Sequence, residues 1–291
     1  MKHIFIALTA LIMTSSAYSQ FQVSASTGYA VGSAGMKLGE ITTVSETGAN
    51  VENSYGSYGE GVNFQIRGTY FFNDTFGADV SLGYLHGSDQ DVTVVNSTSQ
   101  QVNAIARARA FGGSASLVYK FNNNVFGRIG GLFKVAGKTE AVVYNKAVFT
   151  DQEAEAQNLP SGSYSETNYK EDFHGHFPIG FVAALGYNYE LSPNLSLFAE
   201  AEYYGISLKR KDSEISEFNT DIVLPDGTVA AAGVFSIDNL PDGTNKKTTY
   251  VDNLSSSDTD TTKRLSQKVP YSSFGINFGI TYKFKPSASK E

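Results

Sequence analysis

The side chains that could carry out chemistry are few and widely spaced. His86 and Ser88 stand two positions apart and could serve as general base and nucleophile, with Glu60 as the carboxylate that orients the histidine. A second pair, His174 and His176, could ligate a metal ion, but the sequence supplies no evident third ligand. The chain has no cysteine, which excludes thiol enzymes, zinc fingers and disulfide frameworks.

The elements that would position these residues are indicated first by composition. Among the 291 residues 28 are glycine, 20 phenylalanine and 17 tyrosine, but only 7 are proline, a balance that favours twisted β-structure. Hydrophobic residues make up 41% and charged residues 18%, a balance that excludes both a helical membrane transporter and a disordered acidic tail. The net charge of −7 argues against nucleic acid as a partner.

The first residues have the organisation of a secretory signal peptide. A short basic start precedes an apolar core at 4–13, and Ala17 and Ser19 occupy the −3 and −1 positions of a cleavage site. The apolar core is shorter than the roughly 20 residues that span a bilayer, although a retained anchor is the alternative. We therefore expect residues 1–19 to be a signal peptide and the rest of the chain to be exported. We expect no cofactor.

After residue 19 the apolar residues recur with a period of two, and no window carries a sustained helical period. The alternation defines eight segments, 21–29, 64–72, 76–84, 103–121, 128–135, 181–189, 195–203 and 274–284. The fourth segment requires a phase slip at Gly112-Gly113, where a β-bulge would absorb the extra residue. Each segment is predicted to be a strand.

Short and long connections alternate between these strands. The tight turns are at 73–75, 122–124 and 192–194, and the long polar loops are at 33–60, 89–102, 139–173 and 210–267. This layout predicts an all-β fold over residues 20–284: a transmembrane antiparallel up-and-down β-barrel of eight strands, with short periplasmic turns and long extracellular loops. A periplasmic tail, 285–291, follows. A soluble sandwich or lipocalin-like barrel would bury the apolar faces instead.

The last loop contains its own turn signal. Pro225-Asp226-Gly227 predicts a turn at which residues 221–223 and 229–235 pair as a hairpin. If the hairpin at 220–236 joined the barrel, the barrel would have ten strands. The eight-stranded prediction places this hairpin above the membrane.

The polar faces of the strands are predicted to meet inside the barrel. Counted from the tight turns, five charged residues reach similar heights and should form a lumen ion network: Arg67, Asp79, Arg128, Glu200 and Glu202. A higher, basic set could line a vestibule: Arg107, Arg109 and Lys134. One hypothesis is a gated narrow channel; the other, which an eight-stranded bore favours, is a network that seals the barrel.

The export signal, the eight alternating segments and the closing FGINFGITYKF resemble the OmpA/OmpX-like outer-membrane β-barrel family. The resemblance implies insertion by the barrel-assembly machinery, with an assembly signal made of Phe274, Ile276, Phe278, Ile280, Tyr282 and Phe284. A departure from full-length OmpA is that we expect no peptidoglycan-binding domain after the barrel. Separately, a lipid-facing His86-Gly87-Ser88 resembles the site of outer-membrane lipid A deacylases, where histidine is the base and serine the nucleophile.

The expected function is non-catalytic. We expect a monomer in the Gram-negative outer membrane that contacts lipid and lipopolysaccharide and serves envelope integrity, or binds an extracellular ligand through its long loops. A narrow solute channel is the first alternative, and a lipid A-modifying hydrolase is the second.

Overall fold

The structure is a computed structural model that describes residues 20–33, 35–45 and 48–284. The predicted signal peptide, 1–19, and the predicted tail, 285–291, lie outside the described residues. Strands dominate, and the one helix described, α2 (Asp151–Ala156), has 6 residues. No helix in these ranges is long and apolar enough to cross a membrane.

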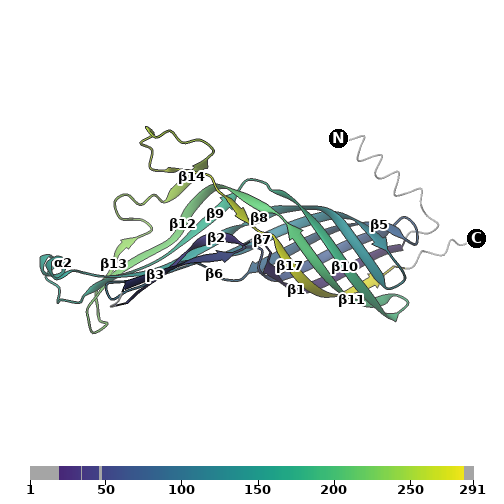
Figure 1. Cartoon of the computed structure of the whole chain (residues 1–291), viewed down its shortest axis with the longest axis horizontal. Helices are drawn as coiled ribbons and strands as arrows, with labels where there is room; N and C mark the ends of the chain where they lie inside the picture. Colours follow the sequence, from purple (N-terminus) through teal and green to yellow (C-terminus); the bar gives the residue numbers. More distant parts are fainter. Residues whose placement is uncertain (1–19, 34, 46–47, 285–291) are drawn as a thin grey trace, which may run out of the picture.

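Eight strands close into a barrel, drawn at the right of Figure 1. In ring order they are β1 (Gln20–Gly32), β4 (Gly61–Phe71), β5 (Phe76–Gly87), β7 (Gln100–Lys120), β8 (Val125–Val148), β10 (Ile179–Ser192), β11 (Leu195–Gly205) and β17 (Ser273–Lys283). Each pairs antiparallel with the next, and β17 pairs with β1 to close the ring. The predicted eight-stranded up-and-down barrel is confirmed. The ten-stranded alternative is wrong, because β12 (Ser207–Val223) and β13 (Val229–Ser236) lie outside the ring.

The turns at one end of the barrel are organised by asparagine side chains. Asn73 Oδ1 accepts hydrogen bonds from the backbone N–H groups two and three residues further on, at 2.9 and 2.7 Å. Asn122 Oδ1 does the same in its own turn, at 2.9 and 2.7 Å. These side chains replace the missing ladder hydrogen bonds, so each turn joins its two strands without a longer loop.

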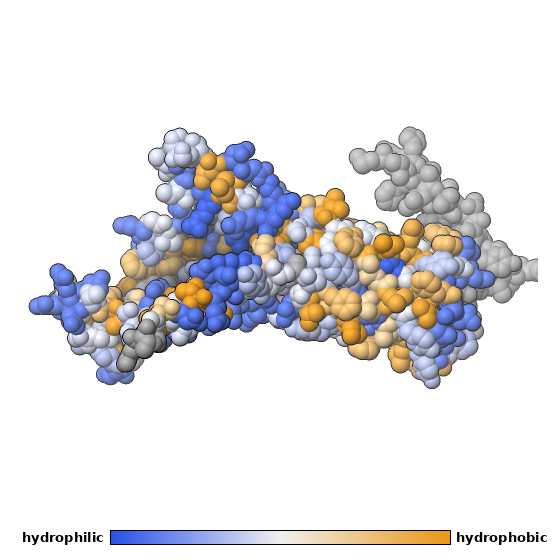
Figure 2. Space-filling model, viewed as in Figure 1, coloured by the Kyte–Doolittle hydropathy of each residue, from blue (hydrophilic) through white to orange (hydrophobic). Residues whose placement is uncertain are grey.

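Side chains alternate between the two faces of the barrel wall. On β4, Asn63, Gln65 and Arg67 are buried, whereas Phe64 and Ile66 are exposed. Large apolar side chains are exposed on the outside of all eight strands, among them Val31, Ile66, Leu82, Leu117, Ile129, Leu185, Leu197 and Phe278. Figure 2 shows apolar residues gathered over this half of the molecule. The barrel is therefore polar inside and apolar outside.

Beyond one end of the barrel, β7 and β8 continue into a second sheet, which we call the extension sheet (Figure 1). It also contains β2 (Met36–Ser45), β3 (Gly48–Gly56), β6 (Gln90–Asn96), β9 (Tyr164–Gly175), β12, β13, β14 (Lys247–Val251), β15 (Lys263–Leu265) and β16 (Lys268–Pro270). The order is β3-β2-β6-β7-β8-β9-β12, and β12 also pairs with β13, β14 and β16.

The connections expected to be long loops are thus largely strand. The hairpin predicted at 221–223 and 229–235 is confirmed, since β12 and β13 pair there. Strands β3, β6 and β9 carry no alternation that the sequence could reveal. In β3, for example, nearly every residue is exposed on either face. A strand that buries neither face needs no apolar residues at alternate positions, and its sequence therefore looks like that of a loop.

The phase slip predicted at Gly112-Gly113 is wrong. Strand β7 pairs with β5 in one unbroken register, and its even-numbered residues from Ala106 to Val118 face inward. The irregularity lies on β8, which has an extra residue opposite the Phe111–Gly112 step of β7. Gly137, near this bulge, has a φ of 98°, a backbone conformation that favours glycine.

Candidate functional site in the barrel interior

Charged side chains from four strands form a layer across the barrel, which we call the ionic layer. Its members are Arg67 on β4, Asp79 on β5, Arg128 on β8, and Glu200 and Glu202 on β11. Glu200 accepts hydrogen bonds from Arg67 Nη1 at 3.1 Å and from Arg128 Nη2 and Nε at 3.1 and 3.2 Å. Arg128 also pairs with Glu202. These ion pairs connect β4, β8 and β11 across the lumen.

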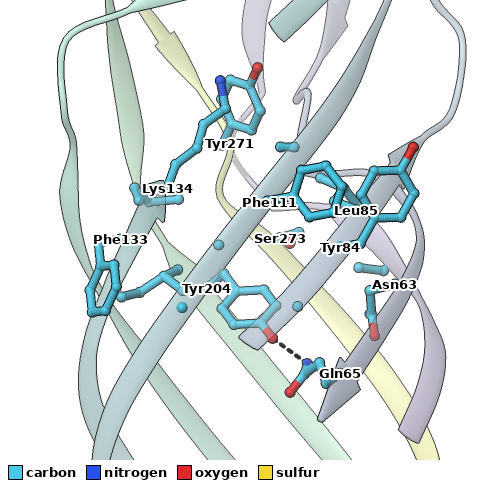
Figure 3. A pocket seen from close by; sticks show the side chains of 18 of the residues that line it. Asn63, Gln65, Tyr84, Leu85, Phe111, Phe133, Lys134, Tyr204, Tyr271 and Ser273 are labelled. Carbon is cyan, nitrogen blue, oxygen red and sulfur yellow. Dashed lines mark hydrogen bonds between the residues drawn. The ribbon is translucent and has the colours of Figure 1, made fainter. Parts of the chain in front are cut away.

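Uncharged side chains complete the layer around Glu202. Asn277 Nδ2 and Gln65 Nε2 donate to Glu202 Oε2 at 2.6 and 2.8 Å. Gln65 is also hydrogen-bonded to the hydroxyl of Tyr204, as Figure 3 shows. None of these three was predicted as a site residue. Their inward parity was the available signal, but at Tyr204 it is obscured because Tyr203 beside it is also a tyrosine.

Asp79 is the least connected member of the layer. It is 2% exposed and lies within the electrostatic influence of Arg128 and Arg67, but neither carboxylate oxygen completes a hydrogen bond within the described ranges. Its immediate cross-strand neighbours on the same face are Thr69 and Ser116. Four of the five predicted network residues therefore form one ion-paired cluster, and Asp79 stands beside it.

On the side of the tight turns, the lumen widens into a polar cavity of about 500 Å³. Arg67 and Asp79 close its inner end, and Lys120, Glu190 and Lys283 lie nearer the turns. Lys283 Nζ is 2.5 Å from Glu190 Oε1 at this rim. The cavity is a vestibule whose inner end is blocked by the ionic layer.

On the other side, an apolar cluster covers the lumen, and we call it the cap. Its buried members are Tyr58, Ala106, Ala108, Ala110, Leu208, Val269 and Tyr271. Tyr271 Oη lies 2.5 Å from Thr139 Oγ1, and burial raises the pKa of Tyr271 to about 12. The phenol therefore stays protonated at neutral pH. With the ionic layer below and the cap above, side chains obstruct the lumen at two levels.

The predicted upper basic set is not brought together. Lys134 faces inward, with its Nζ 5.7 Å from the centroid of the Tyr271 ring. Arg107 and Arg109 have the parity of exposed Phe111 and project from the outer face, because β7 has no phase slip. The interior positions beside them are the alanines of the cap, so no basic vestibule forms at this height.

Outside the barrel, Arg107 belongs to a small ion-pair cluster of the extension sheet. Its guanidinium lies 2.8 Å from Glu140 Oε2 and 3.4 Å from Asp89 Oδ1. Lys138 lies 3.2 Å from Glu140 and 2.8 Å from Asp172. Arg109 instead donates to the carbonyl oxygen of Gly87 at 2.7 Å.

The three residues considered for catalysis are only partly assembled. Tyr29 Oη lies 3.2 Å from Glu60 Oε1 and 3.2 Å from Ser88 Oγ, so it bridges the carboxylate and the hydroxyl. His86 instead meets Tyr84 Oη, at 3.5 Å from Nδ1. No hydrogen bond between His86 and Ser88 is found among the described residues. The nucleophile–base contact that acyl transfer uses is therefore not formed.

The histidines considered for metal binding are also separated in their contacts. His174 Nδ1 lies 2.9 Å from Asp212 Oδ1 on the neighbouring strand β12. Among the residues that the structure describes, no group of three or more His, Cys, Asp or Glu side chains is arranged to hold a metal ion. A His–Asp pair of this kind joins two strands of the extension sheet.

The fold and its interior define a class: a closed eight-stranded antiparallel β-barrel with an apolar outside and an ion-paired interior. No family model matches the sequence, and no curated protein matches it. Among solved structures it is similar to Ail, the attachment invasion locus protein of Yersinia pestis, in complex with the heparin analogue sucrose octasulfate: 11% identity over 92% of this chain and 99% of that chain, with a TM-score of 0.31. The similarity to Neisserial surface protein A is of the same order: 13% identity over 91% of this chain and 97% of that chain, with a TM-score of 0.30.

Proposed function

We propose that this chain is an OmpA/OmpX-like outer-membrane protein whose barrel spans the bilayer and whose extension sheet stands at the cell surface. The observation that carries the proposal is the inverted polarity of the barrel. Glu200 and Glu202 are 2% and 1% exposed inside it, whereas Ile66, Leu82 and Leu117 are 65–66% exposed outside it. Burying apolar surface is worth about 25 cal/mol per Å², so a belt of this kind favours a lipid environment.

The length of the barrel strands supports the same proposal. Strand β17 has 11 residues, and tilted barrel strands climb roughly 2.3 Å per residue, which matches an apolar band about 25 Å tall. Its exposed residues are those of the predicted assembly signal, and Phe284 packs against Phe21 with ring centroids 5.5 Å apart. The proposal includes export through the signal peptide and insertion by the barrel-assembly machinery.

Within this proposal the protein is a monomer without catalytic activity or cofactor, and its work is envelope integrity or surface interaction. The ionic layer and the cap obstruct the lumen, which leaves the extension sheet as the surface open to partners. The guanidinium of Arg109 lies on its outer face, on the side of exposed Phe111, and donates to backbone carbonyl oxygens. It is suited to a phosphate group of lipopolysaccharide, and the strands further out are available to an extracellular ligand.

The test is single-channel conductance of the refolded protein in a planar bilayer, with folding checked by slower gel migration after heating. We expect a silent barrel. Discrete current steps that change in Glu200→Ala, but not in the rim variant Glu190→Ala, would replace this proposal by the narrow-channel alternative. A lipid A mass shift that disappears in Ser88→Ala would replace it by the hydrolase alternative.

Surface exposure is tested separately in intact cells. Protease added outside should cleave the extension sheet and leave a protected barrel fragment. A chain that is fully protected, or that fractionates with soluble proteins, would contradict the proposed location.

A further inference from the structure

A cavity lies between the ionic layer and the cap, and residues of both border it. We call it the upper chamber (Figure 3). Two glycines create it. Gly83 on β5 and Gly112 on β7 are cross-strand partners, both face inward, and both border the chamber. At this pair of positions no side chain projects from the barrel wall into the lumen, and the space is left open.

The upper chamber is lined mainly by apolar side-chain atoms. Tyr204 and Ile206 border it on one side, and Tyr271 and Leu208 of the cap segment border it above. The chamber holds about 110 Å³ and is partly open. An engineered apolar cavity of roughly 150 Å³ binds benzene. The upper chamber is smaller but partly open, so a single ring can fill it with its substituents in the opening.

One polar atom in this apolar wall has no partner. Asn63 is 6% exposed and borders the chamber, yet its Oδ1 accepts no hydrogen bond within the described part of the chain. The nearby polar groups are engaged: Gln65 with Glu202 and Tyr204, and Lys134 Nζ with the carbonyl oxygen of Gly137 at 3.0 Å. A buried acceptor without a donor is costly, and a ligand that brings a donor would remove that cost.

We propose that the upper chamber binds a small aromatic alcohol: a single ring that fills the space bared by Gly83 and Gly112, and a hydroxyl that donates to Asn63 Oδ1. An aromatic ring suits the site because Tyr204 and Tyr271 present ring surfaces to it, and aromatic groups pack favourably on one another. A cation is disfavoured, because the ammonium of Lys134 also borders the chamber and has no salt bridge within the described part of the chain. This binding site is independent of the surface role proposed above.

The experiment uses the refolded chain in detergent micelles, with 4-fluorophenol as the probe and its ¹⁹F NMR shift as the readout. Empty micelles supply the baseline. We expect a saturable shift that is lost in Gly112→Leu, because a side chain there enters the chamber and its Cβ meets only Phe133 O, at 3.2 Å. The matched control is Gly131→Leu, which faces outward with nothing within 4 Å of its Cβ and should bind as the parent does.

Two results would overturn the proposal: no saturation beyond micelle partitioning, or equal binding by the parent and a folded Gly112→Leu. If Gly112→Leu fails to regain heat-modifiable migration, Gly83→Val takes its place. The Cβ of that variant meets Phe64 O at 3.2 Å and Gln65 Cγ at 3.3 Å, so the smaller side chain is chosen.

The role of Asn63 is tested with a pair of probes. Asn63→Leu keeps the shape of the side chain and removes the acceptor. We expect it to weaken 4-fluorophenol about tenfold, the value of one hydrogen bond, and to leave fluorobenzene within about twofold. Equal losses for both probes, or none for either, would contradict the donor–acceptor contact.

Discussion

Arg128 and Glu200 form a two-point ion pair inside the barrel: Nε and Nη2 of the arginine lie 3.2 and 3.1 Å from the two carboxylate oxygens. Both side chains are inaccessible to solvent, and they extend from β8 and β11. Removing one partner of such a pair leaves the other charge buried and uncompensated. The pair therefore links β8 and β11 across the lumen, and substitution of either residue alone should destabilise the barrel.

Glu200→Ala should therefore destabilise the barrel by about 3–5 kcal/mol, since it leaves Arg67 and Arg128 without their shared carboxylate. The measurement is urea unfolding in micelles, followed by tyrosine fluorescence. The control is Glu190→Ala, whose exposed partner contact with Lys283 is worth less than about 1 kcal/mol. Equal midpoints for the two variants would mean that the ionic layer does not stabilise the barrel.

The hydroxyl contact in the cap gives a second prediction. Tyr271 and Thr139 are both buried, and their oxygens are 2.5 Å apart. Thr139→Val should cost about 1–3 kcal/mol because it leaves the phenol without this partner, whereas the double variant with Tyr271→Phe should recover part of the loss. A double-mutant cycle on the unfolding free energy measures the coupling. Purely additive losses would show that the hydrogen bond contributes nothing.

The barrel was predictable because its apolar outer face and its polar interior impose opposite demands on alternate residues. Ile66 and Arg67 are neighbours in sequence, and each has the chemistry of the face it occupies. The strand number, the tight turns and the ion pairing of Arg67, Arg128, Glu200 and Glu202 follow from that alternation.

The extension sheet was not predictable in this way. Strands such as β3 are exposed to solvent on both faces, so their sequences need no alternation of apolar and polar residues. The outward position of Arg107 and Arg109 could not be predicted for a related reason. Ala106, Ala108 and Ala110 suggest a lipid-facing stripe, but alanine also fits an interior filled by large side chains such as Tyr58 and Tyr271. Small apolar residues do not distinguish the two faces, and the partner that decides lies far away in the sequence.

The ion cluster on the extension sheet should make its stability pH-dependent. Burial alone would raise the pKa of Glu140, but hydrogen bonds from Arg107 and Lys138 outweigh burial and hold the pKa below its usual value. A carboxylate with a lower pKa in the folded state stabilises the fold above its unfolded pKa, and this contribution is lost as pH falls through the folded pKa.

Glu140→Gln should consequently be less stable than the parent at pH 6, with the difference shrinking as the pH approaches 3. Thermal midpoints measured across this range give the comparison, and exposed Glu155→Gln is the control for removing a carboxylate from the same region. A difference that stays constant with pH would mean that the charge of Glu140 does not contribute.

The single phase of β7 can be tested by cysteine substitution, because the chain has no cysteine of its own. Arg109 faces outward, whereas Ala108 is 0% exposed and packs in the cap. In the refolded protein a water-soluble maleimide should label Arg109→Cys many times faster than Ala108→Cys. Ala110→Cys, one inward position closer to the turns, repeats the buried case if Ala108→Cys refolds poorly. Fast labelling at 108 and protection at 109 would restore the phase slip at Gly112-Gly113 and return Arg107 and Arg109 to the lumen.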